Sequence, residues 1–165
     1  MPTWPKQSQC DTFYGNPRGR DGHASMAWEA ANLTRVAPPY RMYFAGKPIK
    51  TITVHKKCAD SLLRVLTRIW QVSGEDQKKI DQAGASIYGG CYNYRLMRGG
   101  SILSMHSYGC AIDLDPARNG FHDTTPNFEN HQWIIKSFED EGWVWGGRWK
   151  GRSIDGMHFQ AARVG

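Results

Sequence analysis

The apolar residues between His55 and Val72 constrain the fold of this chain more than any other feature. They recur at spacings of three and four, which is the periodicity of an amphipathic helix with one buried face. The segment therefore predicts a helix that packs on the core through this stripe. Its apolar positions are Cys58, Leu62, Leu63, Leu66, Ile69 and Trp70.

A second helix is predicted from Pro126 to Glu141, because Pro126 suits a first helical position and Gly142 suits the C-terminal cap. Before the first helix, residues 40–44 and 49–54 predict a β-hairpin around a turn at 45–48. Helices that flank a small, mainly antiparallel sheet make an α+β fold, which is our prediction for this chain. Further short strands are predicted at 85–88, 91–95, 111–115, 143–145 and 157–160.

The chain is predicted to form one domain. Its length of 165 residues fits a single hydrophobic core. No internal repeat, low-complexity tract or Pro/Gly/Ser-rich linker divides residues 1–165. Residues 1–25 are rich in Gly, Pro and polar side chains, which predicts a loop-like segment that wraps the domain.

The balance of charges favours anionic partners. With 21 Lys and Arg against 15 Asp and Glu, the formal net charge is +6, which draws a protein toward anionic polymers and surfaces. The basic residues are scattered along the sequence rather than gathered in a run. This scatter argues against a nucleic-acid-binding arm, and we expect no specific nucleic-acid partner.

The N-terminal sequence lacks the apolar stretch of a secretory signal, and no run is long enough to span a bilayer. We therefore expect synthesis in the cytoplasm without a signal peptide. The cysteines are far apart and form no C-x-x-C pair, which predicts reduced, partly buried thiols. A bridge between Cys91 and Cys110 stays open, because connectivity cannot be read from spacing. The four cysteines are Cys10, Cys58, Cys91 and Cys110.

Two segments carry His and Asp residues that suit a catalytic zinc site. Such a site needs three protein ligands from His, Asp or Glu, an open position for water, and a carboxylate that accepts a proton from the water. In segment 104–113, His106 precedes a predicted strand that carries Asp113. In segment 155–159, Asp155 lies three residues before His158, which opens another predicted strand.

The spacing alone does not identify every ligand of this site. Asp113 and Asp115 share one face of the predicted strand, so the pattern does not choose between them. The H-E-x-x-H helix of many zinc peptidases is absent. The remaining histidines are predicted to be structural or exposed, since none has a suitably spaced acid on a strand: His23, His55, His122 and His131.

Together the two segments resemble the zinc D-alanyl-D-alanine carboxypeptidases and dipeptidases and the phage L-alanyl-D-glutamate endolysins. The resemblance rests on the motif S-x-H-x-x-G-x-A-x-D at 104–113, completed by D-x-x-H at 155–158. It also includes Tyr94-Arg95 and the run rich in Trp and Gly at 142–147. It extends over residues 85–160 and is loose over the first 80.

The resemblance implies that His106, Asp113 and His158 hold Zn²⁺. It also implies that Asp155 is the general base and that Arg95 steadies the polarised carbonyl of the substrate. The choice of Asp113 over Asp115 as the ligand comes from the resemblance alone.

Three further residues are candidates for substrate binding, namely Ser104, Tyr108 and Trp145. The last belongs to segment 142–149, whose tryptophan rings could pack in the core or line a cleft beside the glycines. Residues 115–119 predict a turn at the end of the strand. An alternative that the sequence does not decide is a second cation bound by Asp115 and Asn119.

The resemblance implies a peptidoglycan-degrading zinc metallopeptidase of the phage endolysin type, which hydrolyses the L-alanyl-D-glutamate bond of the stem peptide. The expected partners are bacterial peptidoglycan stem peptides, with anionic outer-membrane polymers as a further partner. We expect a monomer that is made in the host cytoplasm and reaches the cell wall in the periplasm after membrane permeabilisation.

Two alternative functions remain at this point. One is a D-alanyl-D-alanine carboxypeptidase, which needs a cation such as Arg98, Arg118 or Arg148 for the terminal carboxylate of its substrate. The other is a non-catalytic, zinc-stabilised binding module, against which the presence of a candidate base at Asp155 argues.

Overall fold

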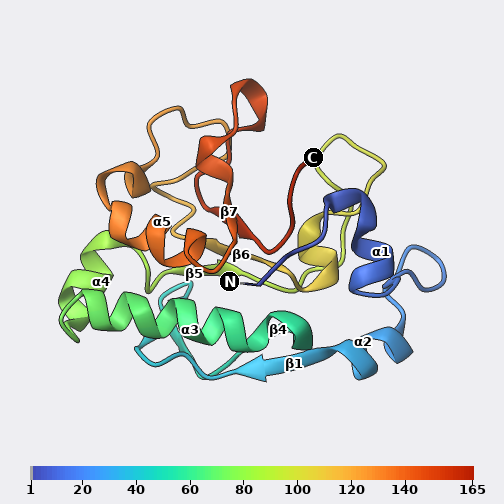
Figure 1. Cartoon of the computed structure of the whole chain (residues 1–165), viewed down its shortest axis with the longest axis horizontal. Helices are drawn as coiled ribbons and strands as arrows, with labels where there is room; N and C mark the ends of the chain where they lie inside the picture. Colours follow the sequence, from blue (N-terminus) through green and yellow to red (C-terminus); the bar gives the residue numbers. More distant parts are fainter. Residues whose placement is uncertain (1) are drawn as a thin grey trace.

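A computed structural model describes residues 2–165 of the chain. Its main sheet is antiparallel and four-stranded, with the order β5-β6-β8-β7. Helices α3 (Lys56–Val72) and α5 (Gln132–Glu139) contact each other and lie beside the sheet (Figure 1). The predicted α+β fold is therefore confirmed. In chain order, the strands of this sheet are β5 (Tyr88–Gly90), β6 (Ala111–Leu114), β7 (Val144–Trp145) and β8 (His158–Gln160).

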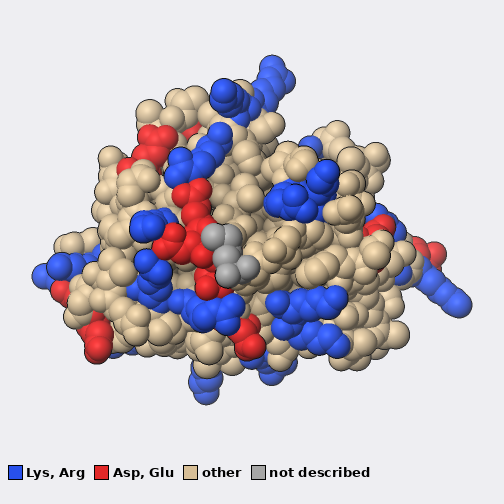
Figure 2. Space-filling view, viewed as in Figure 1, with Lys and Arg blue, Asp and Glu red and all other residues tan. Residues whose placement is uncertain are grey.

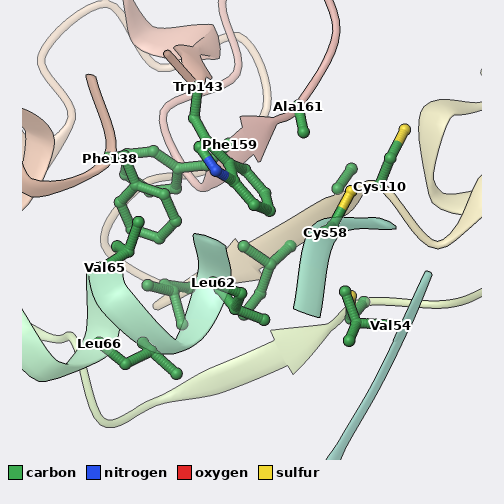
Figure 3. Packing of buried hydrophobic residues seen from close by; sticks show 14 of the residues in the cluster. Val54, Cys58, Leu62, Val65, Leu66, Cys110, Phe138, Trp143, Phe159 and Ala161 are labelled. Carbon is green, nitrogen blue, oxygen red and sulfur yellow. The ribbon is translucent and has the colours of Figure 1, made fainter. Parts of the chain in front are cut away.

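Helix α3 forms where the apolar periodicity predicts it. His55 is its N-cap, and its Nδ1 accepts a hydrogen bond from the backbone N of Lys57 at 3.0 Å. Figure 3 shows the buried face of the helix packed toward Phe138 of α5 and Phe159 of β8. These two rings stack with their centroids 4.0 Å apart. One face of β8 is thus fixed against the core by aromatic packing.

The predicted β-hairpin is present in its first part only. Strands β2 (Met42–Phe44) and β3 (Lys47–Ile49) pair around the two-residue turn Ala45-Gly46, in which both residues have positive φ. The chain then leaves this pair, and β4 (Ile52–His55) pairs with β1 (Leu33–Val36) instead. The prediction of one strand over 49–54 was wrong, because β-branched alternation continues through this change of partner.

The predicted helix over 126–141 is divided into two. A 3-10 helix, η3 (Asn127–Asn130), follows Pro126, and α5 begins only after His131. His131 has φ −134° and ψ 60°, which interrupts the helical backbone. Gly142 follows α5 with φ 81°, a conformation that glycine adopts without steric cost.

Two short α-helices that follow the N-terminal segment were not predicted from the sequence. Helix α2 (Met26–Asn32) begins after Ser25, and helix α4 (Gln77–Ala83) begins after Asp76, and both capping side chains accept backbone hydrogen bonds. The strand predicted at 91–95 does not form, and that segment has an irregular backbone in the structure.

The N-terminal segment wraps the domain, as its composition predicts, although it also contains η1 (Gln7–Gln9) and α1 (Cys10–Phe13). The backbone N of Gln7 donates to the carbonyl of Arg163 at 2.8 Å, and the N of Arg163 donates to the carbonyl of Pro5 at 2.7 Å. The segment before α1 is therefore tied to the chain that follows β8.

All four cysteines are buried, and none of them forms a disulfide in the structure, Cys91 and Cys110 included. Within residues 2–165, none of the helices combines the length and apolar character that crossing a membrane requires.

Strand alternation gives the two faces of the sheet different roles. Ile112 and Leu114 on β6 and Phe159 on β8 are fully buried on the core side. Asp113 and His158 point to the opposite face of the same strands. The core packing therefore fixes the strands that carry these two polar side chains.

Candidate metal centre

His106 reaches the site from η2 (Met105–Tyr108), whose first turn Ser104 caps by accepting a hydrogen bond from the backbone N of His106. The ring Nδ1 of His106 lies 2.7 Å from the carbonyl oxygen of Cys91. A carbonyl can only accept, so Nδ1 carries the proton of the neutral ring and Nε2 keeps a lone pair. Within residues 2–165, this buried Nε2 has no hydrogen-bond partner.

Asp113 and His158 lie opposite each other because β6 and β8 pair in the register Asp113↔His158. Oδ1 of Asp113 lies 3.2 Å from Nε2 of His106 and 3.3 Å from Nδ1 of His158. Asp115 instead follows the end of β6 with φ 47°, and its Oδ2 accepts a hydrogen bond from Arg118 at 2.7 Å. The geometry thus brings Asp113, and not Asp115, to the two histidines.

These three side chains form a cluster whose ligand atoms all lie within 4.8 Å of one another. Nε2 of a neutral His106 and the carboxylate of Asp113 offer only lone pairs, so they have no hydrogen to share. A cation between them resolves this conflict. Two imidazole nitrogens and one carboxylate oxygen are a donor set of catalytic zinc sites, so the residues present fit zinc.

The charges within the cluster favour a positive centre. Burial raises the pKa of Asp113, but the hydrogen bonds and charges that His106 and His158 supply when their rings are protonated outweigh this effect and bring the pKa well below its ordinary value. Burial lowers the pKa of His158, but the hydrogen bond to Asp113 and the charges of Asp113 and Asp155 raise it overall. A positive charge between these three side chains, such as that of a metal ion, is therefore favourable.

Asp155 lies beside the cluster without joining it. Its backbone N donates to the carbonyl of Gly146 at 3.0 Å, and its carbonyl accepts from the N of His158 at 3.1 Å. A Cβ at Gly146 would lie 2.4 Å from the carbonyl oxygen of Asp155, so this approach requires glycine. In the part of the chain that the structure describes, the buried Oδ1 of Asp155 has no hydrogen-bond partner, and burial, aided by the charge of Asp113, raises the pKa of this carboxyl.

The cluster opens into a cleft of about 960 Å³ that Arg95 also lines. Hydrogen bonds hold the backbone of Arg95, since Oγ of Ser107 accepts from its N at 2.9 Å and donates to its carbonyl at 2.7 Å. Further basic side chains of the cleft are Arg98, Lys150 and Arg152. Lys and Arg otherwise form separate groups on the face shown in Figure 2, in keeping with their scatter in the sequence.

Of the predicted substrate-binding residues, the structure brings Ser104 to the cleft but not Tyr108 or Trp145. The hydroxyl of Tyr108 donates to Oδ1 of Asp11 at 2.6 Å, and Nε1 of Trp145 donates to the carbonyl of Gly156 at 2.7 Å. Both rings are buried. The tryptophan of segment 142–149 that lines the cleft is Trp149, whose ring centroid lies 5.6 Å from that of His158.

The three arginines considered for a substrate carboxylate differ in position. Arg118 donates to Asp115 and to the carbonyl of Gln82, and Arg148 forms two hydrogen bonds with Glu139. Arg98 lines the cleft, with its guanidinium 5.0 Å from the centroid of the Phe121 ring. Only Arg98 of the three is placed to meet a ligand in the cleft.

The other predicted polar residues have structural or surface positions. The side chain of Asn119 donates to the carbonyl of Asp115 and accepts from the N of Phe128, so its polar atoms already have partners within the turn. His55 is the buried cap of α3, and His23 is exposed. His131 is partly buried, while His122 is exposed at the rim of the cleft.

Residues 98–161 match a protein-family model described as D-alanyl-D-alanine carboxypeptidase. The matched segment contains all three residues of the cluster and Asp155, and it confirms the family resemblance of the sequence motifs. Comparisons with curated proteins and with solved structures give no match. The family match supports, at a general level, a zinc peptidase that acts on peptidoglycan.

Proposed function

We propose that this protein is a zinc metallopeptidase of the phage endolysin type that hydrolyses the L-alanyl-D-glutamate bond of peptidoglycan stem peptides. The observation that carries the proposal is the convergence of His106, Asp113 and His158 beside Asp155, whose buried Oδ1 has no hydrogen-bond partner among residues 2–165. The family match supports the peptidase class. The choice of bond and the phage origin are our inference from the motifs.

In this proposal His106, Asp113 and His158 would hold the metal, with Nε2 of His106 and Nδ1 of His158 facing the Asp113 carboxylate. A bound zinc ion supplies Lewis acidity, which lowers the pKa of water toward about 7 and polarises a carbonyl. The chain supplies the remaining functions, which are proton transfer and charge stabilisation.

Asp155 accepts the proton of the attacking water and passes it to the leaving amine. Its position suits this role because it lies beside the cluster and its buried Oδ1 is not used by another group. Burial raises its pKa, which makes its carboxylate a better proton acceptor than an exposed one. The guanidinium of Arg95 offsets the negative charge that develops on the carbonyl oxygen.

We further propose that the enzyme works as a monomer, is made in the host cytoplasm and reaches the cell wall after another factor permeabilises the membrane. Its net charge of +6 would draw it toward the anionic polymers of the wall and the outer membrane. The basic residues at the cleft would add to this attraction near the substrate.

A D-alanyl-D-alanine carboxypeptidase is the second candidate, and the position of Arg98 favours it. An enzyme that removes a terminal residue needs a cation for the terminal carboxylate, and Arg98 lines the cleft, where its charge also acts on Asp155. A stem peptide also carries carboxylates within its chain, so Arg98 suits the endopeptidase as well.

Mass spectrometry of digested muropeptides separates these functions. We expect new free L-alanine carboxyl ends on the glycan side, with no release of D-alanine. Release of D-alanine would instead identify the carboxypeptidase. The matched control is the same protein stripped of metal by a chelator and then reloaded with zinc, because hydrolysis should stop and return.

The same experiment tests the non-catalytic alternative. A protein that binds about one zinc ion per chain and yet leaves every muropeptide intact would be a binding module and would contradict the enzyme proposal.

A further inference from the structure

We infer that Gln160 is a positioning residue that fixes the tautomer of His158, so that Nδ1 of this ring presents a lone pair to the metal. The inference rests on the zinc site proposed above, but it concerns a hydrogen position that can be measured without metal. It adds to the site a residue that lies outside its sequence motifs.

Gln160 and His158 lie on the same face of β8, since they are two residues apart on one strand. Gln160 is 1% exposed. Its Oε1 lies 2.8 Å from Nε2 of His158, which is the ring nitrogen that faces away from Asp113. The two side chains are therefore in direct hydrogen-bond contact in a buried site.

The orientation of the Gln160 amide follows from its other two contacts. Its Nε2 donates to the carbonyl of Ala162 at 2.9 Å and to Oε1 of Gln7 at 2.8 Å. A backbone carbonyl can only accept, so the reversed amide would place two oxygens against each other whichever way Gln7 is turned. Oε1 is thus the atom that faces His158.

Two acceptor oxygens face this ring, Oε1 of Gln160 at 2.8 Å from Nε2 and Oδ1 of Asp113 at 3.3 Å from Nδ1. A neutral imidazole has a single N–H hydrogen, and the shorter contact has the distance of a good hydrogen bond. Nε2 of a neutral His158 therefore carries the proton, and Nδ1 is left with the lone pair that points to Asp113. His106 shows the complementary arrangement, because the carbonyl of Cys91 holds its Nδ1 proton and frees Nε2. His106 thus presents Nε2 to the metal site and His158 presents Nδ1. The other nitrogen of each ring donates to its own acceptor, the Cys91 carbonyl for His106 and Gln160 for His158.

Without Gln160 the other tautomer of His158 becomes favourable. A proton on Nδ1 could then be donated to Oδ1 of Asp113, which is only 3.3 Å away. That proton would occupy the position of the metal. Gln160 prevents this competition. Gln160 in turn donates a hydrogen bond to the side chain of Gln7, and the backbone N of Gln7 donates to the carbonyl of Arg163.

The first test needs only the metal-free parent protein. Ring ¹⁵N chemical shifts, recorded at an alkaline pH where His158 is neutral, distinguish a proton on Nε2 from one on Nδ1. We expect the Nε2–H form. A neutral His158 that carries its proton on Nδ1 would overturn the inference.

The second test compares Gln160→Met with Gln160→Glu. Methionine keeps the length and removes the acceptor, so we expect a mixed or reversed tautomer and zinc affinity that is about ten- to a hundredfold weaker. Glutamate keeps the acceptor but loses the donors to Ala162 and Gln7, so it should lower the melting temperature yet retain the Nε2–H tautomer and near-parental zinc affinity.

The outcomes separate this inference from the proposed function. Equal zinc affinity and an unchanged tautomer in Gln160→Met would refute the positioning role while the parent still binds zinc. An equal loss of affinity in both variants would refute it too, because affinity would then follow stability. A parent that binds no zinc but shows Nε2–H would contradict the metal proposal and support the tautomer assignment.

Discussion

Replacing Asp155 by Asn tests the general base, because it keeps the size of the side chain and removes its basicity. Oδ1 of Asp155 is buried without a partner, so no hydrogen bond to that atom is lost. The substitution also removes a charge whose burial is unfavourable, as the raised pKa of this carboxyl indicates. We therefore expect an unchanged or higher melting temperature, unchanged zinc content and turnover lower by roughly two to four orders of magnitude.

The matched control is Asp115→Asn, a buried aspartate that directly follows β6. Asp115 is buried outside the cleft and accepts a hydrogen bond from Arg118 at 2.7 Å. Its replacement should lower the free energy of unfolding by about 1 to 3 kcal/mol and leave turnover per folded molecule intact. Zinc content, melting temperature and muropeptide hydrolysis are measured on one preparation. Near-parental hydrolysis by Asp155→Asn would refute its role as base, and loss of zinc would make it a ligand.

Three further predictions concern the ligands, the oxyanion and the pH dependence of stability. His106→Ala should lose zinc in metal analysis whereas His131→Ala should keep it, since two remaining protein ligands rarely hold zinc; retained zinc and activity would contradict the ligand assignment. Arg95→Ala should keep zinc and fold but lower kcat by about a hundredfold in muropeptide assays, and an unchanged kcat would exclude the role. Burial lowers the pKa of His55 from 6.5 to about 4, so the folded state resists protonation. The contribution of neutral His55 to the free energy of unfolding is fully present above pH 6.5. It is lost as the pH falls, because the unfolded state binds the proton first, and denaturant titrations should show a decrease of about 3 kcal/mol between pH 6.5 and 4. His55→Asn should lack this fall, and an equal fall in that variant would remove His55 as the cause.

The elements that the sequence predicted correctly are those whose signal is local. The stripe that begins at Cys58 needs only helical periodicity, and α3 follows it over Lys56–Val72. The exchange of strand partners after Ile49 depends on contacts with Leu33–Val36, which lie far away in the sequence. The break at His131 has no local signal that we could use, because the sequence continues a helical pattern through it.

The candidate site divides in the same way. Its His and Asp residues stand in two short motifs, so the sequence could identify them, but only the register of β6 with β8 separates Asp113 from Asp115. Trp145 and Trp149 stand in one run rich in Gly, and sequence cannot tell that only the second lines the cleft. Gln160 carried one available signal, namely its place two residues after His158 on a strand.

The most direct test of the central claim is an anomalous-diffraction map of zinc-loaded crystals, recorded on both sides of the zinc absorption edge. We predict one strong peak bonded to Nε2 of His106, a carboxylate oxygen of Asp113 and Nδ1 of His158, at about 2.0 to 2.2 Å from each atom. Oδ1 of Asp155 should lie near the peak without bonding to it. No peak at this position, or a zinc ion bound elsewhere while the three side chains remain unligated, would contradict the account.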